Sequence, residues 1–227
     1  MDKSTESAQE LSVKTESYLF PTAFNLYRPR LSHLHTYTLG EHKNKPLYTA
    51  TTHPVVSNQP DIVLHTGPNE TSPALATYSI NRFSSDRCVE LDPGREGAQP
   101  LSQHVKRSFH ACGFEVELAG PKGPRWEKFE WRRSRGQDIP RIGAQPWGHK
   151  LVWITSVGPE EVVVAVCSRP GSAYTGTKVF KFEFVGPGAS GVLGDRWATM
   201  AVITALGQWR EDVRRRLFYM YVFVGVV

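Results

Sequence analysis

Cysteine is scarce in this chain of 227 residues, which contains only Cys88, Cys112 and Cys167. The number is odd and the positions lie far apart, so the pattern does not fit the disulfide framework of a secreted protein. We therefore expect three reduced thiols, buried as small apolar side chains, in an intracellular protein.

An N-terminal targeting signal is also lacking. Residues 1–17, MDKSTESAQELSVKTES, carry acidic side chains and no apolar segment, unlike a secretory signal or an Arg-rich transit peptide. Their composition predicts a disordered polar tail. Together with the cysteine pattern, this favours a cytoplasmic location and leaves peripheral association with membranes open.

The apolar runs are too short to cross a bilayer as a helix, which takes about 20 residues. The charge-free segment 217–227, which follows Arg214–Arg216, reaches only about half of the hydrocarbon thickness. Its β-branched and aromatic content favours aggregation unless the segment is covered. We expect it to dock onto the folded domain. The alternative is shallow insertion into a membrane interface, with the three arginines near the headgroups.

Motifs of nucleophilic catalysis and of zinc binding are missing. No serine stands in a G-x-S-x-G turn, and the three cysteines lack the local signature of a nucleophile. Zinc sites use four ligands at short paired spacings, which the histidines and cysteine of segments 33–35 and 104–112 do not supply. We expect a protein that is not an enzyme and that holds no metal.

One motif invites a cofactor interpretation, the G-x-G-x-x-G segment Gly186–Gly191 between a predicted strand and a predicted helix. In a dinucleotide fold the helix opens within the glycines and the preceding strand is buried on both faces. Here Asp195 marks a later helix start, and the strand before the glycines carries Lys181 and Glu183. We interpret the segment as a flexible connector and expect no cofactor.

Short apolar or alternating segments, separated by Gly, Pro, Asn and Asp, fill most of the chain and are typical of antiparallel β-structure. In segment 178–185, Phe180, Phe182 and Phe184 share one face and Lys181 and Glu183 the other. The continuously apolar segment 162–166 predicts a strand covered on both faces. We predict strands at 34–39, 47–52, 62–66, 74–82, 88–91, 113–118, 125–133, 151–156, 162–168 and 178–185, and loops at 92–103 and 136–148.

A helix is predicted over Asp195–Arg216, with Asp195 as its N-cap. From Trp197 to Leu206 it is apolar on all sides except for two threonines, so it needs cover all round. Glu211 and Arg215, like Asp212 and Arg216, form i,i+4 pairs at an end expected to emerge into water. Gly207 fits a place where a neighbour comes close.

A curved sheet that closes around this helix satisfies both patterns, because a sandwich would leave one side of the helix uncovered. We therefore predict an all-β fold, a closed antiparallel barrel around a central hydrophobic C-terminal helix. One domain spans residues 18–216, preceded by the tail 1–17 and followed by the apolar segment 217–227.

The net charge of +5 and pI near 9.2 allow an anionic partner. Cations gather around one predicted strand, where only Glu127 and Glu130 oppose them. Alternation places Lys128 and Arg132 on the face of Trp126, and Arg133 on the opposite face with Phe129 and Trp131. The candidate ligand-binding residues are Lys128, Arg132, Arg133 and Arg135, suited to phosphate contacts.

A solvated barrel surface is the alternative for this cluster. Nucleic acid is not expected as the partner, because the aromatic rings among the cations point into the core instead of offering a stacking platform.

The F-E-W-R-R strand at 129–133, the strand opening at Leu47 and the near-terminal apolar helix that ends in arginines resemble fungal uncharacterised families of the tubby C-terminal-like superfamily. These families are relatives of phospholipid scramblases and LURP-one-related proteins. The resemblance covers residues 30–216 and implies a barrel of about twelve strands around the C-terminal helix. Because tubby-like members bind phosphoinositides, it also implies an anionic phospholipid as ligand.

Three functional hypotheses follow. The first is a barrel domain that binds anionic phospholipid, such as a phosphoinositide, at a membrane surface. The second is a structural or protein-interaction domain without a ligand, and the third is a scramblase-like membrane-associated protein. We expect a monomer.

Overall fold

The computed structural model describes most of the chain. The described residues are 19–28, 35–54, 57–81, 86–92, 101–107, 111–120, 123–135, 147–154, 161–169 and 177–223. The predicted polar tail 1–17 and most of the predicted loop 136–148 lie outside them.

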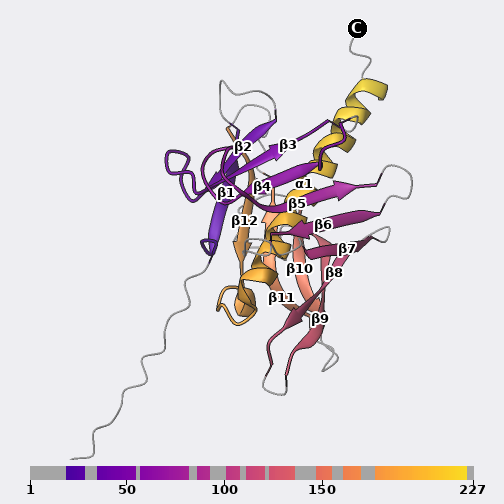
Figure 1. Ribbon diagram of the computed structural model, residues 1–227. Coiled ribbons are helices and arrows are strands. Elements are labelled where there is room, and N and C mark those ends of the chain that lie inside the picture. Colours follow the sequence, from indigo (N-terminus) through magenta and orange to yellow (C-terminus); the bar gives the residue numbers. More distant parts are fainter. Residues whose placement is uncertain are drawn as a thin grey trace, which may run out of the picture.

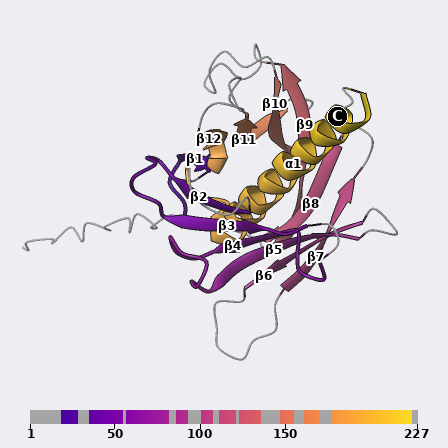
Figure 2. The same ribbon diagram turned by 90° about the horizontal axis from the view of Figure 1, so that it is seen from above.

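Twelve antiparallel strands form a closed barrel in the order β1-β12-β11-β10-β9-β8-β7-β6-β5-β4-β3-β2. Each strand lies beside its neighbours in the sequence, and β1 closes the ring by pairing with β12 (Figures 1 and 2). The strands are β1 Ala23–Tyr27, β2 Thr36–Gly40, β3 Tyr48–Thr52, β4 Ile62–His65, β5 Ala74–Ile80, β6 Arg87–Leu91, β7 Leu101–Arg107, β8 Ala111–Leu118, β9 Arg125–Arg135, β10 Trp147–Ile154, β11 Val162–Ser168 and β12 Lys178–Phe184.

Alternation along the strands builds the core. Phe180, Phe182 and Phe184 of β12 are buried, whereas Lys181 and Glu183 between them are partly exposed. Strands β8 and β9 repeat the pattern with buried aromatic rings at positions 114, 129 and 131.

The central part of β11 is covered on both faces, as predicted. Val164 lies in the main core of the barrel, while Val166 packs outside it against Val163 and Val185. A strand with apolar cover on both sides has no need of alternation, which explains its continuous run of apolar residues.

Helix α1, Gly194–Phe223, runs lengthwise through the barrel (Figure 2). The apolar positions 197, 201, 203, 205 and 206 are all buried, which confirms the prediction of an enclosed helix. The hydroxyl of Thr204, one of two buried threonines in α1, donates to the Met200 carbonyl and accepts from the indole of Trp131, so its hydrogen bonds are made with both the helix and β9.

A crowded contact with β5 explains Gly207 within α1. A Cβ at this position would lie 2.5 Å from the ring of Tyr78. The glycine therefore lets the helix and the tyrosine approach more closely than any other residue would allow.

The segment Gly186–Gly191 is a packed connector. Gly186–Gly188 form a short 3-10 helix, η2, between β12 and α1. A Cβ at Gly188 would meet the Val164 carbonyl oxygen at 2.0 Å, and Gly191 has a φ of 86° that favours glycine. Close packing and backbone geometry account for these glycines without a nucleotide.

Several element boundaries predicted from the sequence need correction. Strands β1 and β7 were not predicted, and Leu101–Gln103 belong to β7 instead of to the predicted loop 92–103. Residues 147 and 148, which were assigned to the loop 136–148, belong to β10.

Asp195 is not the N-cap that the sequence predicted. It lies in the first turn of a helix that begins at Gly194, and its carboxylate accepts a hydrogen bond from the backbone N–H of Leu19 at 3.2 Å. It therefore fastens the segment before β1 to the helix.

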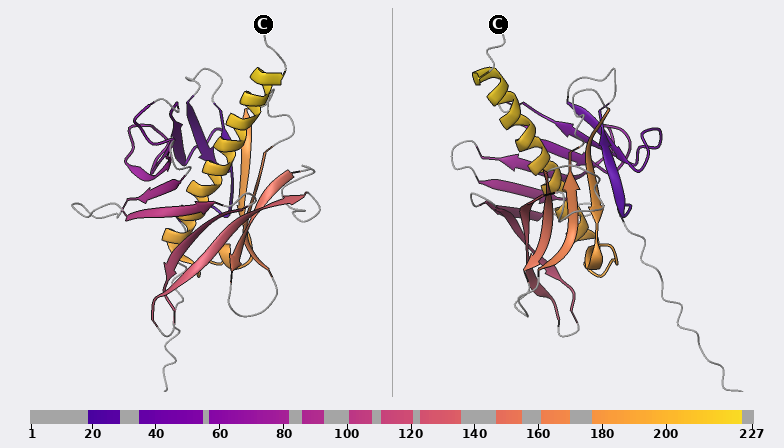
Figure 3. Two further views of the ribbon diagram at one scale, coloured as in Figure 1. Left: turned by 90° about the vertical axis from the view of Figure 1, so that its right-hand side faces the viewer. Right: turned by 180° about the vertical axis from the view of Figure 1, so that it is seen from behind.

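The helix does not end at Arg216. It continues to Phe223, and its last turns stand clear of the strands (Figures 1 and 3). Leu217, Phe218 and Tyr219 are exposed, so the prediction that segment 217–227 docks onto the barrel is wrong for these three residues. Within the described residues, no helix is both long and apolar enough to cross a membrane.

Candidate functional site

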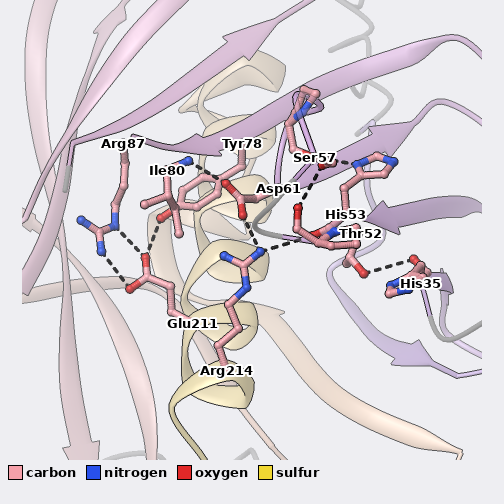
Figure 4. A network of polar contacts seen from close by, with 12 residues as sticks. His35, Thr52, His53, Ser57, Asp61, Tyr78, Ile80, Arg87, Glu211 and Arg214 are labelled. Atoms are coloured by element: carbon pink, nitrogen blue, oxygen red, sulfur yellow. Dashed lines mark hydrogen bonds and ion pairs between the residues drawn. The ribbon is translucent and has the colours of Figure 1, made fainter. Parts of the chain in front are cut away.

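A buried charged network holds α1 inside the barrel. The Glu211 carboxylate accepts from the Nε and Nη2 atoms of Arg87 at 2.6 and 2.9 Å, and from the hydroxyl of Tyr78 at 3.0 Å (Figure 4). Glu211 is 6% exposed and Arg87 5%. Because the guanidinium is bound bidentately, this pair fixes both the depth and the rotation of the helix against β5 and β6.

The pKa values of the network follow from burial and from the shared charge. Burial and the negative Glu211 raise the pKa of Tyr78 well above its usual value, so the phenol stays protonated as a donor. Burial is the largest single effect on Arg87 and would lower its pKa, but the hydrogen bond and the charge of Glu211, together with smaller contributions from Tyr78 and Cys112, raise the pKa overall. Both groups therefore keep the protonation state that the network needs.

A second contact fastens α1 about one turn further on. The Nη2 atom of Arg214 donates to the Asp61 carboxylate and to the His53 carbonyl (Figure 4). Asp61 also accepts from the backbone N–H of Ile80 at 2.8 Å. The last helical turns, which project beyond the barrel, are thus held in a defined direction.

Basic side chains outnumber acidic ones around the point where α1 leaves the barrel. We call this region the helix exit and define it as Arg133, His149, Arg169 and residues 210–219. Arg169 lies 3.8 Å from Asp212, Arg133 pairs across the strands with His149, and His149 interacts electrostatically with Asp212 and Arg215. Its helical part carries arginine at positions 210, 214, 215 and 216, against the two acids Glu211 and Asp212. The excess of positive charge makes this region the candidate site for an anionic ligand.

Not all of these cations are neutralised by neighbouring carboxylates. Among the described residues, Arg133, Arg210 and Arg216 take part in no ion pair, whereas Arg169 lies 3.8 Å from Asp212. The charges of the first three are therefore not offset by a direct contact.

His149 lies among the charged side chains of the helix exit. Burial lowers its pKa from the usual value near 6.5. The carboxylate of Asp212 acts in the opposite direction, and Arg133, Arg169 and Arg215 lower it further. The imidazole is therefore neutral at pH 7, and the arginines around it remain a cationic cluster that would attract an anion.

The four binding residues predicted from the sequence all belong to β9, but the strand carries them on different faces. Lys128 and Arg132 lie on the outer face of β9, and Arg133 on the opposite face, where β9 pairs with His149 of β10. Arg135 belongs to the same strand, but its side chain lies outside the described residues. The described members of the set therefore do not form one site.

Arg132 is already neutralised by ion pairs. Its guanidinium lies 3.3 Å from Glu130 and 2.5 Å from Glu161, and Glu161 also pairs with Lys150 at 2.5 Å. These hydrogen bonds lower the pKa of Glu161. Arg133 has no such partner in the part of the chain that the structure describes, so it is the predicted binding residue that the helix exit retains.

The histidines and cysteines considered from the sequence form no metal or nucleophile site within the described residues. The described residues contain no group of His, Cys, Asp or Glu side chains that could hold a metal, and His33 and His110 lie outside them. Cys112 and Cys167 are buried, and burial raises the pKa of the Cys167 thiol, which opposes thiolate formation.

Sequence reasoning missed the groups that fasten the helix. Arg87 and Glu211 are separated by 124 residues, and no local motif links them. Glu211 was assigned with Arg215 to a solvated helix end. The two side chains do approach to 3.5 Å, but Glu211 is buried and bound to the barrel.

Comparisons of the chain with protein-family models, with curated proteins and with solved structures found no match.

Proposed function

We propose that the barrel binds membranes that contain anionic phospholipid, and that it does so through the helix exit. The observation that carries this proposal is the exposed end of α1. Leu217, Phe218 and Tyr219 are exposed directly after Arg214–Arg216, with Phe218 at 65% and Tyr219 at 59%.

This combination suits a membrane interface. Aromatic and leucine side chains enter the boundary between headgroups and acyl chains, while neighbouring arginines bind phosphates. Each basic residue near an anionic surface contributes about 1 kcal/mol of attraction. The exposed apolar residues are too few to hold the protein on a membrane alone, so the proposal requires both the rings and the cations.

The buried contacts of α1 support the same interpretation. Glu211 and Arg214 are bound to Arg87 and Asp61 of the barrel, so the projecting turns keep one direction without a membrane. A site with a fixed orientation loses little conformational entropy on binding. The resemblance to tubby-like proteins, which rests in part on the same arginines, agrees with the proposal of a phospholipid. The proposal assigns the barrel no chemical reaction.

Charge reversal at neighbouring positions of β9 tests the proposal. Arg133→Glu changes the charge at the helix exit by two units, so binding to vesicles of phosphatidylcholine with phosphatidylserine should weaken by about 2 kcal/mol, roughly thirtyfold. Arg132→Glu makes the same charge change on the outer face of β9, beside Glu130 and Glu161. It is the matched control and should leave vesicle binding within about twofold.

The measurement is co-sedimentation with vesicles at physiological salt. Phe218→Ser with Tyr219→Ser should also reduce binding, while Trp126→Ser, which removes an aromatic ring 61% exposed on β9, should not. Equal loss from Arg132→Glu and Arg133→Glu would reject the helix exit as the binding surface. Absence of binding by the parent protein would reject the function.

A further inference from the structure

The ladder between β7 and β8 is short. Within the described residues, the ladder joins only Lys106 to Gly113 and Arg107 to Cys112. On their other sides, β7 pairs with β6 over Leu101–Val105, and β8 pairs with β9 along its whole length. Both strands therefore continue past the point where their shared ladder stops.

The two strands separate beyond this point. In Figure 1, β8 descends together with β9, whereas β7 stays beside β6. The stretches that would have paired next are Leu101–Val105 on β7 and Phe114–Leu118 on β8. Within the described residues these two facing edges share no ladder, and strand edges without a ladder are templates for another strand. We call the two facing edges the β7/β8 wedge.

Side chains on the inner side of the wedge are apolar with one polar exception. Phe114, Val116 and Leu118 of β8 are buried, as is Val105 of β7. The Oε1 atom of Gln103, on the same face of β7 as Val105, is buried and has no hydrogen-bond partner. An inserted strand would bring apolar side chains, and its polar groups would come within reach of this oxygen.

Side chains on the outer side of the β8 edge are acidic. Glu115 and Glu117 are both exposed and share the outer face of the strand. On the side of β9, Glu115 lies opposite Lys128 and Glu117 lies opposite Trp126, so the register already places a cation across from one of the two carboxylates.

The carboxylates of Glu115 and Glu117 favour one kind of added strand over another. If two copies of the β8 edge paired with each other, carboxylates would lie opposite carboxylates, which is unfavourable. A strand with lysine or arginine at alternate positions would place cations there instead.

We propose that the β7/β8 wedge binds an extended peptide, which adds as a strand to the β8 edge. Its side chains alternate between apolar residues, which lie beside Phe114, Val116 and Leu118, and basic residues, which lie beside Glu115 and Glu117. Backbone hydrogen bonds supply affinity and the alternating side chains supply specificity, as in other cases of strand addition. This binding is independent of the membrane surface proposed for the helix exit.

A fluorescent peptide of alternating lysine and valine, with blocked ends, is the probe. Fluorescence anisotropy should show saturable binding to the parent protein at physiological salt. A peptide of the same sequence that is N-methylated at its central residues keeps the charge but loses backbone donors, and it should bind at least about tenfold more weakly. Amide exchange of Phe114–Leu118 should slow when the first peptide is present.

Charge variants test the edge itself. Glu115→Lys with Glu117→Lys should weaken binding by roughly tenfold or more, because two attractive cross-strand pairs become repulsive. Glu41→Lys with Glu70→Lys makes the same change of net charge in loops outside the barrel wall, and it should leave binding within about twofold. Equal binding of the N-methylated peptide, equal loss in both double variants, or no binding of the probe would each overturn the proposal.

Discussion

Replacement of Glu211 by glutamine is expected to lower the free energy of unfolding by about 3–5 kcal/mol. The change leaves the guanidinium of Arg87, which is 5% exposed, without its counter-charge inside the barrel. It also weakens the hydrogen bond to Tyr78 that holds the helix against β5. Urea unfolding, followed by tryptophan fluorescence, measures this difference.

The matched control is Glu161→Gln. Glu161 also makes two short ion pairs, to Arg132 and Lys150, but it is exposed, so its loss should cost no more than about 1 kcal/mol. The double variant Arg87→Met with Glu211→Leu removes both buried charges and should recover most of the lost stability. If Glu211→Gln costs no more than Glu161→Gln, the buried network does not fasten the helix.

Ala201→Asp should prevent folding altogether. Ala201 is 0% exposed in the middle of the enclosed part of α1, so the new carboxylate would lie in the apolar core without a partner. Circular dichroism should show no cooperative melting. Val192→Asp adds the same charge at an exposed position just before α1 and should change the melting temperature little. A cooperative transition near that of the parent in Ala201→Asp would contradict an enclosed helix.

Local sequence patterns were sufficient to predict the barrel and its central helix. The apolar run from Trp197 to Leu206 required cover on all sides, and alternation in strands such as β12 indicated which rings would provide it. Strand β7 escaped prediction because its inward position Gln103 is polar, which interrupts the apolar alternation. Its pairing with β6 depends on the tertiary arrangement and not on a local preference.

The candidate site was harder to predict because its parts come from distant segments. Arg133 and His149 become neighbours only through the pairing of β9 with β10. The Arg-rich segment 214–216 is typical of a helix end, and it suggested a boundary that the structure does not have. The sequence did raise shallow membrane insertion of segment 217–227, with the three arginines near the headgroups, but only as the alternative to docking, and it did not place that segment on the same helix as the arginines.

A fluorescent label at the end of α1 tests most directly whether this end faces the membrane. The variant Tyr219→Cys, in a Cys88→Ser background, can carry an environment-sensitive dye, because Cys112 and Cys167 are buried. The control is Trp126→Cys in the same background, at an exposed position near the start of β9. With phosphatidylserine vesicles, we predict a blue shift and quenching by spin-labelled lipid for the dye at position 219 only. A dye at position 219 that remains in water while the protein is bound to vesicles would contradict the account.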